Sequence, residues 1–207
     1  MSAGGSAGAY FALKRAFDVV ASAAGLVLTA PVLGALALWV KLDSRGPVLY
    51  RAPRVGRGGR VFHMLKLRTM VVGADRGASS SGDDDPRITR SGRFLRQYKL
   101  DELPQLVNVF KGEMSLVGPR PQVQWAVDLY TPEERELLSV PPGITDLASL
   151  RFPNEGEILK GSADPDKTYM EKIHPEKVRL GLQYVRARSF RVDLEIIAAT
   201  LTAIFRK

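Results

Sequence analysis

The hydrophobic pattern divides the chain into an apolar N-terminal run and a longer part of mixed polarity. No charged side chain occurs from Val19 to Val40, and cations flank this run on both sides. A run of ~20 apolar residues is long enough to cross the hydrocarbon core of a bilayer as a helix. We therefore predict a membrane helix over residues 11–42, preceded by a disordered segment of small residues at 1–10.

Pro31 lies in the middle of the apolar run. A proline inside a helix removes one backbone donor and clashes with the carbonyl one turn earlier. In lipid the freed carbonyl needs another partner, and the hydroxyl of Thr29 is a local candidate. Because cations lie at both ends, the residues alone leave two topologies open: a kinked helix that spans the bilayer, and a helix broken at Pro31 that leaves by the face it entered. A buried helix of a soluble core is a third reading, which so long an apolar run disfavours.

Residues 43–207 predict a small mixed α/β domain. Two short strands, over residues 48–50 and 61–67, flank a "GRGG" turn. Glycine, serine and aspartate residues then predict a loop over 73–90. Helical spacing of apolar residues or capping residues mark five later segments, which are residues 92–96, 104–110, 131–140, 175–188 and 191–207.

The last of these segments carries an apolar stripe of Leu194, Ile197, Leu201 and Phe205. A helix with such a stripe lies in the bilayer interface or packs on the core of a domain. Both readings use the same residues, so the sequence leaves them open.

Composition narrows the class of partner. The chain of 207 residues has a formal net charge of +8 and no cysteine. The absence of cysteine excludes disulfides and thiolate metal sites. The excess of positive charge favours anionic partners, which are nucleic acid, anionic lipid or phosphorylated small molecules. The chain has no GxxxxGK[ST] phosphate loop, which argues against an ordinary nucleoside triphosphatase.

An acidic pair, Asp101 and Glu102, occurs among cations in "LRQYKLDELPQL". Adjacent acids on an exposed turn are common, but here Arg96 and Lys99 closely precede the pair. Cations bind phosphates, one carboxylate can attack phosphorus as a nucleophile, and the other can hold a divalent metal. Carboxylate oxygens suit magnesium. The pattern therefore favours phosphoryl transfer over a solvated turn.

Further cations occur where the backbone is constrained. Arg120 lies between two prolines, which fix the backbone direction on both sides of a guanidinium suited to phosphate. Lys66 and Arg68 in "KLRTM" lie on a predicted strand, where alternate residues share a face. The candidate phosphate-binding residues are therefore Lys66, Arg68, Arg96 and Arg120.

Several stretches, in order, resemble the bacterial sugar transferase family, and within it the small monotopic polyprenyl-phosphate phosphoglycosyltransferases. The resemblance covers about residues 13–145 and continues more weakly from Tyr169 to the end. The stretches are "KRAFDVV", "KLDSRGPVLYR", "RVGRGGRVFHMLKLRTM", "DPRITRSGRFLR", "LDELPQLVNVFKGEMSLVGPRPQ" and "YTPEERELLSVPPGIT".

The resemblance implies an enzyme that moves a sugar phosphate from a nucleoside diphosphate sugar, usually uridine-linked, to an undecaprenyl-type polyprenyl phosphate. This is the first membrane step of a surface glycan pathway. It implies that Asp101 is the nucleophile of a covalent phosphosugar intermediate and that Glu102 supports it. It further implies that both carboxylates hold Mg²⁺. The phosphate-binding residues of the family map to Lys66, Arg96 and Arg120.

The resemblance also implies a location. It indicates a re-entrant membrane helix broken at Pro31, interfacial amphipathic helices, and a catalytic domain on the cytoplasmic face of the inner membrane of a bacterium. No four-helix membrane bundle precedes the apolar run, so we expect the compact form of the family. A homodimer stays open.

The chain departs from the family pattern at three places. Ala30 precedes the membrane proline, where the family often has serine, and Tyr98 and Lys99 stand where small hydroxylated residues are common. The stretch "DLASLRFPNEGEILKG" after "PGIT" is also unusual. These departures leave the sugar and the roles of Tyr98 and Lys99 unassigned.

Two readings from other classes compete with the enzyme. Arginines at 87, 90, 93 and 96 permit a membrane-anchored nucleic-acid-binding protein, whose affinity for DNA would fall steeply with salt. A non-enzymatic scaffold that recruits partners to the membrane is the other. The enzyme reading predicts no nucleic acid partner, and it treats the isolated His63 and His174 as structural.

Overall fold

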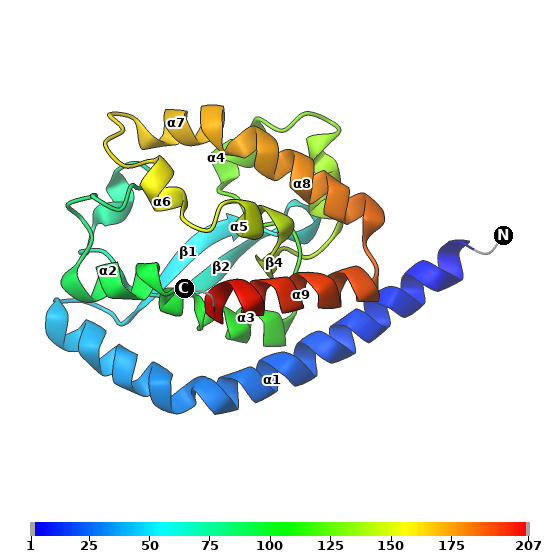
Figure 1. Cartoon of the computed structure of the whole chain (residues 1–207), viewed down its shortest axis with the longest axis horizontal. Coiled ribbons are helices and arrows are strands. Elements are labelled where there is room, and N and C mark those ends of the chain that lie inside the picture. The colour runs from blue at the N-terminus through cyan, green and yellow to red at the C-terminus, as the bar shows by residue number, and fades with distance from the viewer. Residues whose placement is uncertain (1–2, 206–207) are drawn as a thin grey trace.

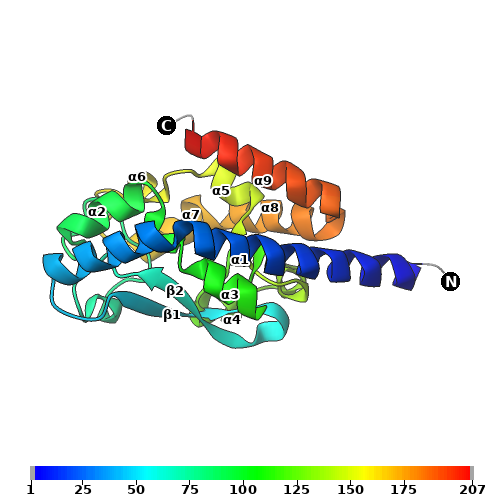
Figure 2. The same cartoon turned by 90° about the horizontal axis from the view of Figure 1, so that it is seen from below.

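The computed structural model describes the backbone of residues 3–205 and the side chains of residues 8–203. One long helix, α1 (Ala3–Asp43), runs along one side of a mixed helix and strand body (Figure 1). Seen from below, α1 crosses the width of the molecule (Figure 2). By length and composition α1 could cross a membrane. Its outward face is apolar, with Val27, Leu28 and Leu42 each more than 70% exposed.

Pro31 does not interrupt this helix. α1 is helical throughout, and Figure 1 shows it bending in its middle. The expected break at Pro31 is therefore a bend within one helix, and the re-entrant topology stays a prediction. The Thr29 hydroxyl donates to the Gly25 carbonyl oxygen at 2.7 Å. The carbonyl that Pro31 frees belongs to Val27, four residues before it. Thr29 therefore does not satisfy the freed carbonyl. Its hydroxyl bonds to a carbonyl one turn before Thr29 itself, a contact that also bends helices.

The N-terminal end of α1 differs from the sequence-based expectation. The structure has helix from Ala3, where the sequence predicted a disordered segment over residues 1–10; residues 1–2 lie outside the described part. Tertiary contact favours this extension of the helix, because the Tyr10 hydroxyl donates to Asp193 Oδ2 at 3.0 Å.

The predicted hairpin is confirmed. β1 (Leu49–Val55) pairs antiparallel with β2 (Val61–Leu67). The turn between them includes the 3₁₀ helix η1 (Arg57–Gly59), where Gly58 and Gly59 have φ of +68° and +77°, a region that favours glycine. A second sheet, which the sequence did not predict, pairs β3 (Ser115–Val117) in parallel with β4 (Gly143–Thr145).

Helices surround these strands, with α7 and α8 on the far side of the hairpin from α1 (Figure 1). Four predicted helical segments form α2, α3, α8 and α9, whereas the segment at 131–140 forms only a 3₁₀ helix, η4. The bounds are η2 (Ala74–Arg76), α2 (Arg90–Gln97), η3 (Leu100–Glu102), α3 (Gln105–Lys111), α4 (Gln124–Asp128), η4 (Glu134–Ser139), α5 (Leu147–Arg151), α6 (Glu155–Ile158), α7 (Pro165–Lys172), α8 (His174–Ala187) and α9 (Phe190–Phe205).

The apolar stripe predicted on α9 is divided between core and surface. Ile197 packs against the main core beside the buried Ile196. Leu194 and Leu201 are 43% and 50% exposed, and the side chain of Phe205 lies outside the described residues. Core packing therefore uses only part of the stripe, and the interfacial placement of the exposed part stays a prediction.

A buried ion pair joins α1 to the C-terminal helices. Lys14 Nζ lies 2.9 Å from Asp193 Oδ2, and both side chains are buried. Asp193 Oδ1 also accepts a hydrogen bond from the Tyr184 hydroxyl at 2.7 Å. A buried charge is costly unless it is paired and hydrogen-bonded, so these contacts fix α1 against α8 and α9.

Two further charged residues of α1 bind helix ends. Arg15 donates to the carbonyl oxygens of Val109 and Phe110, at 2.6 and 2.7 Å, and so caps the C-terminal end of α3. Asp43 accepts hydrogen bonds from the backbone N–H and the hydroxyl of Ser91, at 2.9 and 2.8 Å, in the first turn of α2. α1 is thereby docked on the body on both sides of its apolar run.

Replacing Lys14 tests this docking. Lys14→Met leaves Asp193 buried without its cation, so we expect a loss of about 3–5 kcal/mol in the free energy of unfolding. Thermal unfolding of detergent-solubilised protein is then expected at a midpoint roughly 10 °C lower. The matched control is Lys111→Met, which removes an exposed lysine; equal midpoints for the two variants would contradict the assigned role.

Candidate active site

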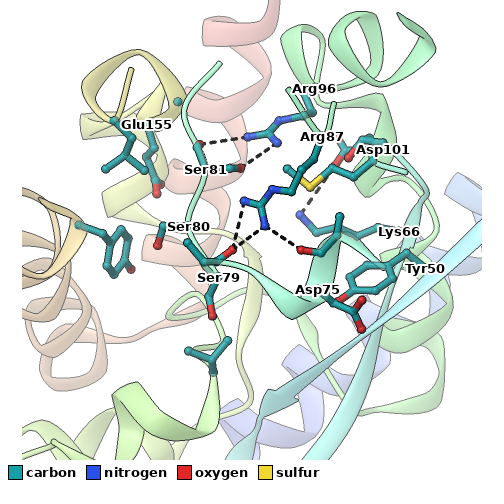
Figure 3. Close-up of a pocket in the computed structure, with 18 of the residues that line it drawn as sticks. Tyr50, Lys66, Asp75, Ser79, Ser80, Ser81, Arg87, Arg96, Asp101 and Glu155 are labelled. Atoms are coloured by element: carbon teal, nitrogen blue, oxygen red, sulfur yellow. Dashed lines mark hydrogen bonds and ion pairs between the residues drawn. The ribbon is translucent and has the colours of Figure 1, made fainter. Parts of the chain in front are cut away.

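A cleft of about 520 Å³ lies between β2, the turn after α2, the loop over residues 71–87 and the start of α6 (Figure 3). It collects side chains from distant parts of the chain. Six of the predicted site residues are among its lining, together with Lys99; these six are Lys66, Arg68, Arg96, Asp101, Glu102 and Arg120.

The acidic pair lies on a tight turn. Asp101 and Glu102 belong to η3, and Lys99, just before it, has a φ of +58°. Among the described residues Lys99 is the one non-glycine residue with a positive φ. This conformation costs roughly 1–2 kcal/mol for an L-residue and tends to be retained at functional sites. The turn leaves Asp101 buried, with 5% of its surface exposed.

Glu102 is held between two cations. Lys66 Nζ donates to Glu102 Oε1 at 3.0 Å. Arg120 reaches both carboxylate oxygens, with Nη1 2.9 Å from Oε2 and Nη2 bonded to Oε1. Burial alone would raise the pKa of Glu102, but Arg120 and Lys66 outweigh it and hold that pKa well below its usual range. Glu102 is therefore a permanent anion that fixes both cations in place.

Asp101 has a different environment. Its Oδ2 lies 3.7 Å from Lys66 Nζ, and no described residue donates a hydrogen bond to its carboxylate within normal distance. Burial raises the pKa of Asp101 above its usual range, and the nearby charges of Lys66 and Arg120 offset this only in part. Burial therefore outweighs the cations at Asp101, which is the reverse of the balance at Glu102.

Arg96 and Arg120 reach the cleft from different elements. Arg96, on α2, donates from Nη1 to the Ser81 hydroxyl at 2.9 Å (Figure 3). No carboxylate pairs with Arg96 among the described residues, so its charge is available to an anion. Arg120 lies after β3, and its backbone N–H donates to Asp146 Oδ2 at 3.2 Å.

Arg68 also lines the cleft, but most of its hydrogen bonds go to the chain that precedes the hairpin. Its guanidinium donates to the carbonyl oxygens of Pro47 and Ser44, at 2.6 and 2.9 Å, and to the Ser44 hydroxyl at 2.6 Å. Only 5% of the residue is exposed. Because β2 ends at Leu67, the alternation that should place Lys66 and Arg68 on one face no longer holds. Arg68 ties the chain after α1 to the hairpin through four hydrogen bonds. One of its five N–H groups is left, so a contact of Arg68 with phosphate stays a prediction.

The loop over residues 73–90 closes one side of the cleft. The backbone N–H groups of Ser79 and Ser80 donate to the Asp166 carboxylate, at 2.9 and 2.7 Å, which ties the loop to α7. Arg87, which the sequence grouped with the free cations, forms a two-pronged pair with Asp85. Arg87 therefore organises the loop, and its charge is neutralised.

Sequence reasoning missed several lining residues. Lys177 on α8 pairs with Glu155 on α6, at 2.7 Å between Nζ and Oε1, and its ammonium lies 5.1 Å from the ring centroid of Tyr169. These residues are far along the chain from the acidic pair, Asp101 and Glu102, and belong to no local motif. Only the tertiary fold reveals them. Tyr98 does not line the cleft; its ring packs on Phe94 with centroids 4.8 Å apart.

The donor set fits a magnesium ion that arrives with a phosphorylated ligand. No cluster of three acidic or histidine ligands occurs among the described residues, but magnesium uses only one or two protein carboxylates when substrate phosphates and waters complete its shell. The Asp101 carboxylate is free of hydrogen bonds. Glu102 accepts three hydrogen bonds out of about four that a carboxylate can accept, which leaves one site on Oε2.

Known proteins are similar in sequence to this chain along most of its length. A family described as "Bacterial sugar transferase" matches residues 9–207. "UDP-glucose:undecaprenyl-phosphate glucose-1-phosphate transferase" of Caulobacter vibrioides is 40% identical over 92% of this chain and 69% of its own. "Undecaprenyl-phosphate glucose phosphotransferase" of Komagataeibacter xylinus is also 40% identical, over 91% of this chain and 35% of its own.

A third relative is named for another sugar. "UDP-N-acetylgalactosamine-undecaprenyl-phosphate N-acetylgalactosaminephosphotransferase" of Aeromonas hydrophila is 34% identical over 94% of this chain and 44% of its own. The chain thus spans between about a third and two thirds of these relatives. Since the family match covers almost the whole chain, the protein belongs to the bacterial sugar transferase family of enzymes.

Proposed function

We propose that this protein transfers a sugar 1-phosphate from a uridine diphosphate sugar to undecaprenyl phosphate. The observation that carries the proposal is the cleft in which Glu102 fixes Lys66 and Arg120 beside a buried, unbonded Asp101. Cations held in place before the reaction stabilise phosphoryl charge without reorganisation. The names of the relatives support both substrates.

The reaction would proceed in two displacements. An Asp101 oxygen attacks the phosphorus that carries the sugar, and the bond from that phosphorus to the uridine monophosphate oxygen breaks. The phosphate oxygen of undecaprenyl phosphate then attacks the same phosphorus, and Asp101 leaves as a carboxylate. Each step forms one P–O bond and breaks one. One cleft can therefore serve two phosphorylated substrates in turn.

The other side chains hold charge. Lys66 and Arg120 carry two positive charges against the single charge of Glu102, so they keep a net attraction for a diphosphate. Arg96 adds an unpaired guanidinium. Magnesium, held by Asp101 and Glu102 with the diphosphate, would neutralise charge on the departing phosphate. Lys99, which lines the cleft, has a pKa lowered first by burial.

The location proposed for the enzyme is the cytoplasmic face of the bacterial inner membrane. The exposed apolar face of α1 supports insertion. Near its C-terminal end, Trp39 packs on Phe94, with ring centroids 5.3 Å apart, and Phe94 packs on Tyr98. Aromatic side chains of this kind concentrate at membrane–water interfaces. The proposed topology is a helix that dips into one leaflet with its bend at the deepest point.

Replacing the nucleophile tests the proposed function directly. Asp101→Asn is expected to lower turnover at least about a thousandfold and to abolish the covalent phosphosugar adduct, because an amide cannot displace uridine monophosphate. The measurement is release of uridine monophosphate, with intact-protein mass spectrometry for the adduct. Asp128→Asn, the same change at an exposed site outside the cleft, is the control; adduct formation by Asp101→Asn would overturn the assignment.

The acid side of the pH–rate profile reports on Asp101. The ionised form of Asp101 is the nucleophile and its pKa is raised, so the rate should begin to fall, as pH decreases, above the ordinary aspartate pKa of about 3.9. Lys66 lowers that pKa, so Lys66→Met should move the acid limb to higher pH. The first half-reaction without lipid is measured, because a phosphate monoester itself titrates near pH ~6. If the acid limb of Lys66→Met stayed in place or moved to lower pH, Lys66 would not be the cation that lowers the pKa of Asp101.

Removal of magnesium separates catalysis from folding. Glu102 is held by Lys66 and Arg120 and not by a metal, so chelation with EDTA should abolish uridine monophosphate release and leave the thermal unfolding midpoint unchanged. Added Mg²⁺ should restore the rate. Full activity in EDTA would show that the cations suffice alone.

A further inference from the structure

A second charged cluster lies on the wall of the cleft, apart from the dyad. Glu155 begins α6, and Figure 3 shows it on the side of the cleft away from Asp101 and Lys66. Its Oε1 lies 2.7 Å from Lys177 Nζ. Lys177 in turn is buried against Tyr169, whose hydroxyl donates to Gln122 Oε1 at 3.2 Å. The mechanism above uses none of these residues.

The ion pair leaves one oxygen of Glu155 facing the cleft. The Lys177 side chain is 9% exposed, whereas that of Glu155 is 30% exposed. Lys177 holds Oε1, and no hydrogen bond to Oε2 comes from any described residue. Because Lys177 is itself confined by Tyr169, the carboxylate cannot swing freely. Glu155 is therefore a fixed, charged hydrogen-bond acceptor that is open to a ligand.

A carboxylate in this position suits the hydroxylated parts of the proposed substrates. It would repel phosphates, which are anionic, and it offers nothing to a polyprenyl chain, which is apolar. The donors that match it are the hydroxyl groups of the transferred sugar and of the uridine ribose, and hydrogen bonds to a charged acceptor are among the stronger ones. The transferred sugar is the part bonded directly to the phosphorus that Asp101 would attack, whereas a contact with the ribose, which every UDP-sugar shares, would affect all sugars equally.

The position of Glu155 relative to the phosphate-binding cations agrees with this match. Burial lowers the pKa of Arg120 and Glu102 raises it, and Glu155 is close enough to add to the effect of Glu102. Glu155 and Arg120 line the same cleft, so a diphosphate bound at Arg120 would have its sugar in the same cavity as Glu155. The relatives carry different sugars in their names, so the residues that contact the sugar are expected to control the choice among substrates.

We propose that Glu155, positioned by Lys177, accepts hydrogen bonds from sugar hydroxyls and determines which nucleotide sugar the cleft accepts. This proposal rests on the proposed function and names a specificity residue within it. Glu155 touches the substrate, and Lys177 acts through Glu155 as a positioning residue.

The experiment compares sugars on one enzyme preparation. Wild-type protein in detergent, with undecaprenyl phosphate and Mg²⁺, is assayed with UDP-glucose, UDP-galactose and UDP-N-acetylgalactosamine, and then with single-deoxy analogues of the preferred sugar. We expect one analogue to react about tenfold less well. Glu155→Gln should lower kcat/KM for the preferred sugar about tenfold and leave that analogue within twofold. The ratio of kcat/KM for the preferred sugar to kcat/KM for the analogue does not depend on the fraction of folded protein, because both are measured on the same sample.

Two further variants complete the test. Glu171→Gln makes the same change on the exposed face of α7 and should preserve the wild-type ratio. Glu155→Asp keeps the charge beside Lys177 and withdraws the acceptor by one methylene; it should also reduce discrimination, and it replaces Glu155→Gln if that variant does not fold. The proposal would be overturned if Glu155→Gln lowered kcat/KM equally for all sugars, or if both Glu155 variants kept the wild-type ratio of kcat/KM between sugar and analogue. In either case the proposed function would stand. If wild type released uridine monophosphate from no nucleotide sugar, the proposed function would fail and this inference with it.

Discussion

The buried pairing of Lys14 with Asp193 is the constraint on which the geometry of this protein depends. It places a charge of the apolar helix inside the body, where Tyr10 and Tyr184 complete the hydrogen bonding of the aspartate. Asp18 adds a second buried contact, because it accepts the Leu116 backbone N–H at 3.0 Å. Breaking one partner of such a set leaves an uncompensated charge, so α1 cannot shift without a large cost. The outer face of α1 is apolar, and the polar residues on its inner face fix it to the body.

The contacts of α1 with the body also position Asp101 and Glu102, through a short stretch of chain. Arg15 of α1 caps α3, and α3 begins three residues after Glu102. The depth of the carboxylates relative to α1 is therefore set by rigid helices and by the strained turn at Lys99. Within the cleft the two acids have opposite electrostatic characters, since Glu102 is paired with two cations whereas Asp101 is buried with few contacts. One carboxylate organises charge and the other is left reactive, a division also found where paired acids share one site.

Local signals in the sequence predicted the elements, and tertiary contacts decided the rest. The hairpin, α2, α3 and α8 follow from turn glycines and apolar spacing, and the cations around the dyad follow from composition and motif. The contacts of Arg68 could not be predicted, because its partners Pro47 and Ser44 are 21 and 24 positions away along the chain. The meeting of Glu155 with Lys177 could not be predicted either, since they are 22 positions apart and α7 lies between the helices that carry them. Likewise the raised pKa of Asp101 comes from burial, which no single stretch of sequence displays.

The bend of α1 has a consequence for how the protein meets a membrane. In Figure 1 both ends of the helix rise from the bend toward the body, so the cations before and after the apolar run lie on one side. Moving a lysine or arginine to the middle of a bilayer costs about 2.5–3.5 kcal/mol on insertion scales. A chain of this shape could partition into a single leaflet with no charged group carried into the hydrocarbon, and its attachment would need no translocation of α1.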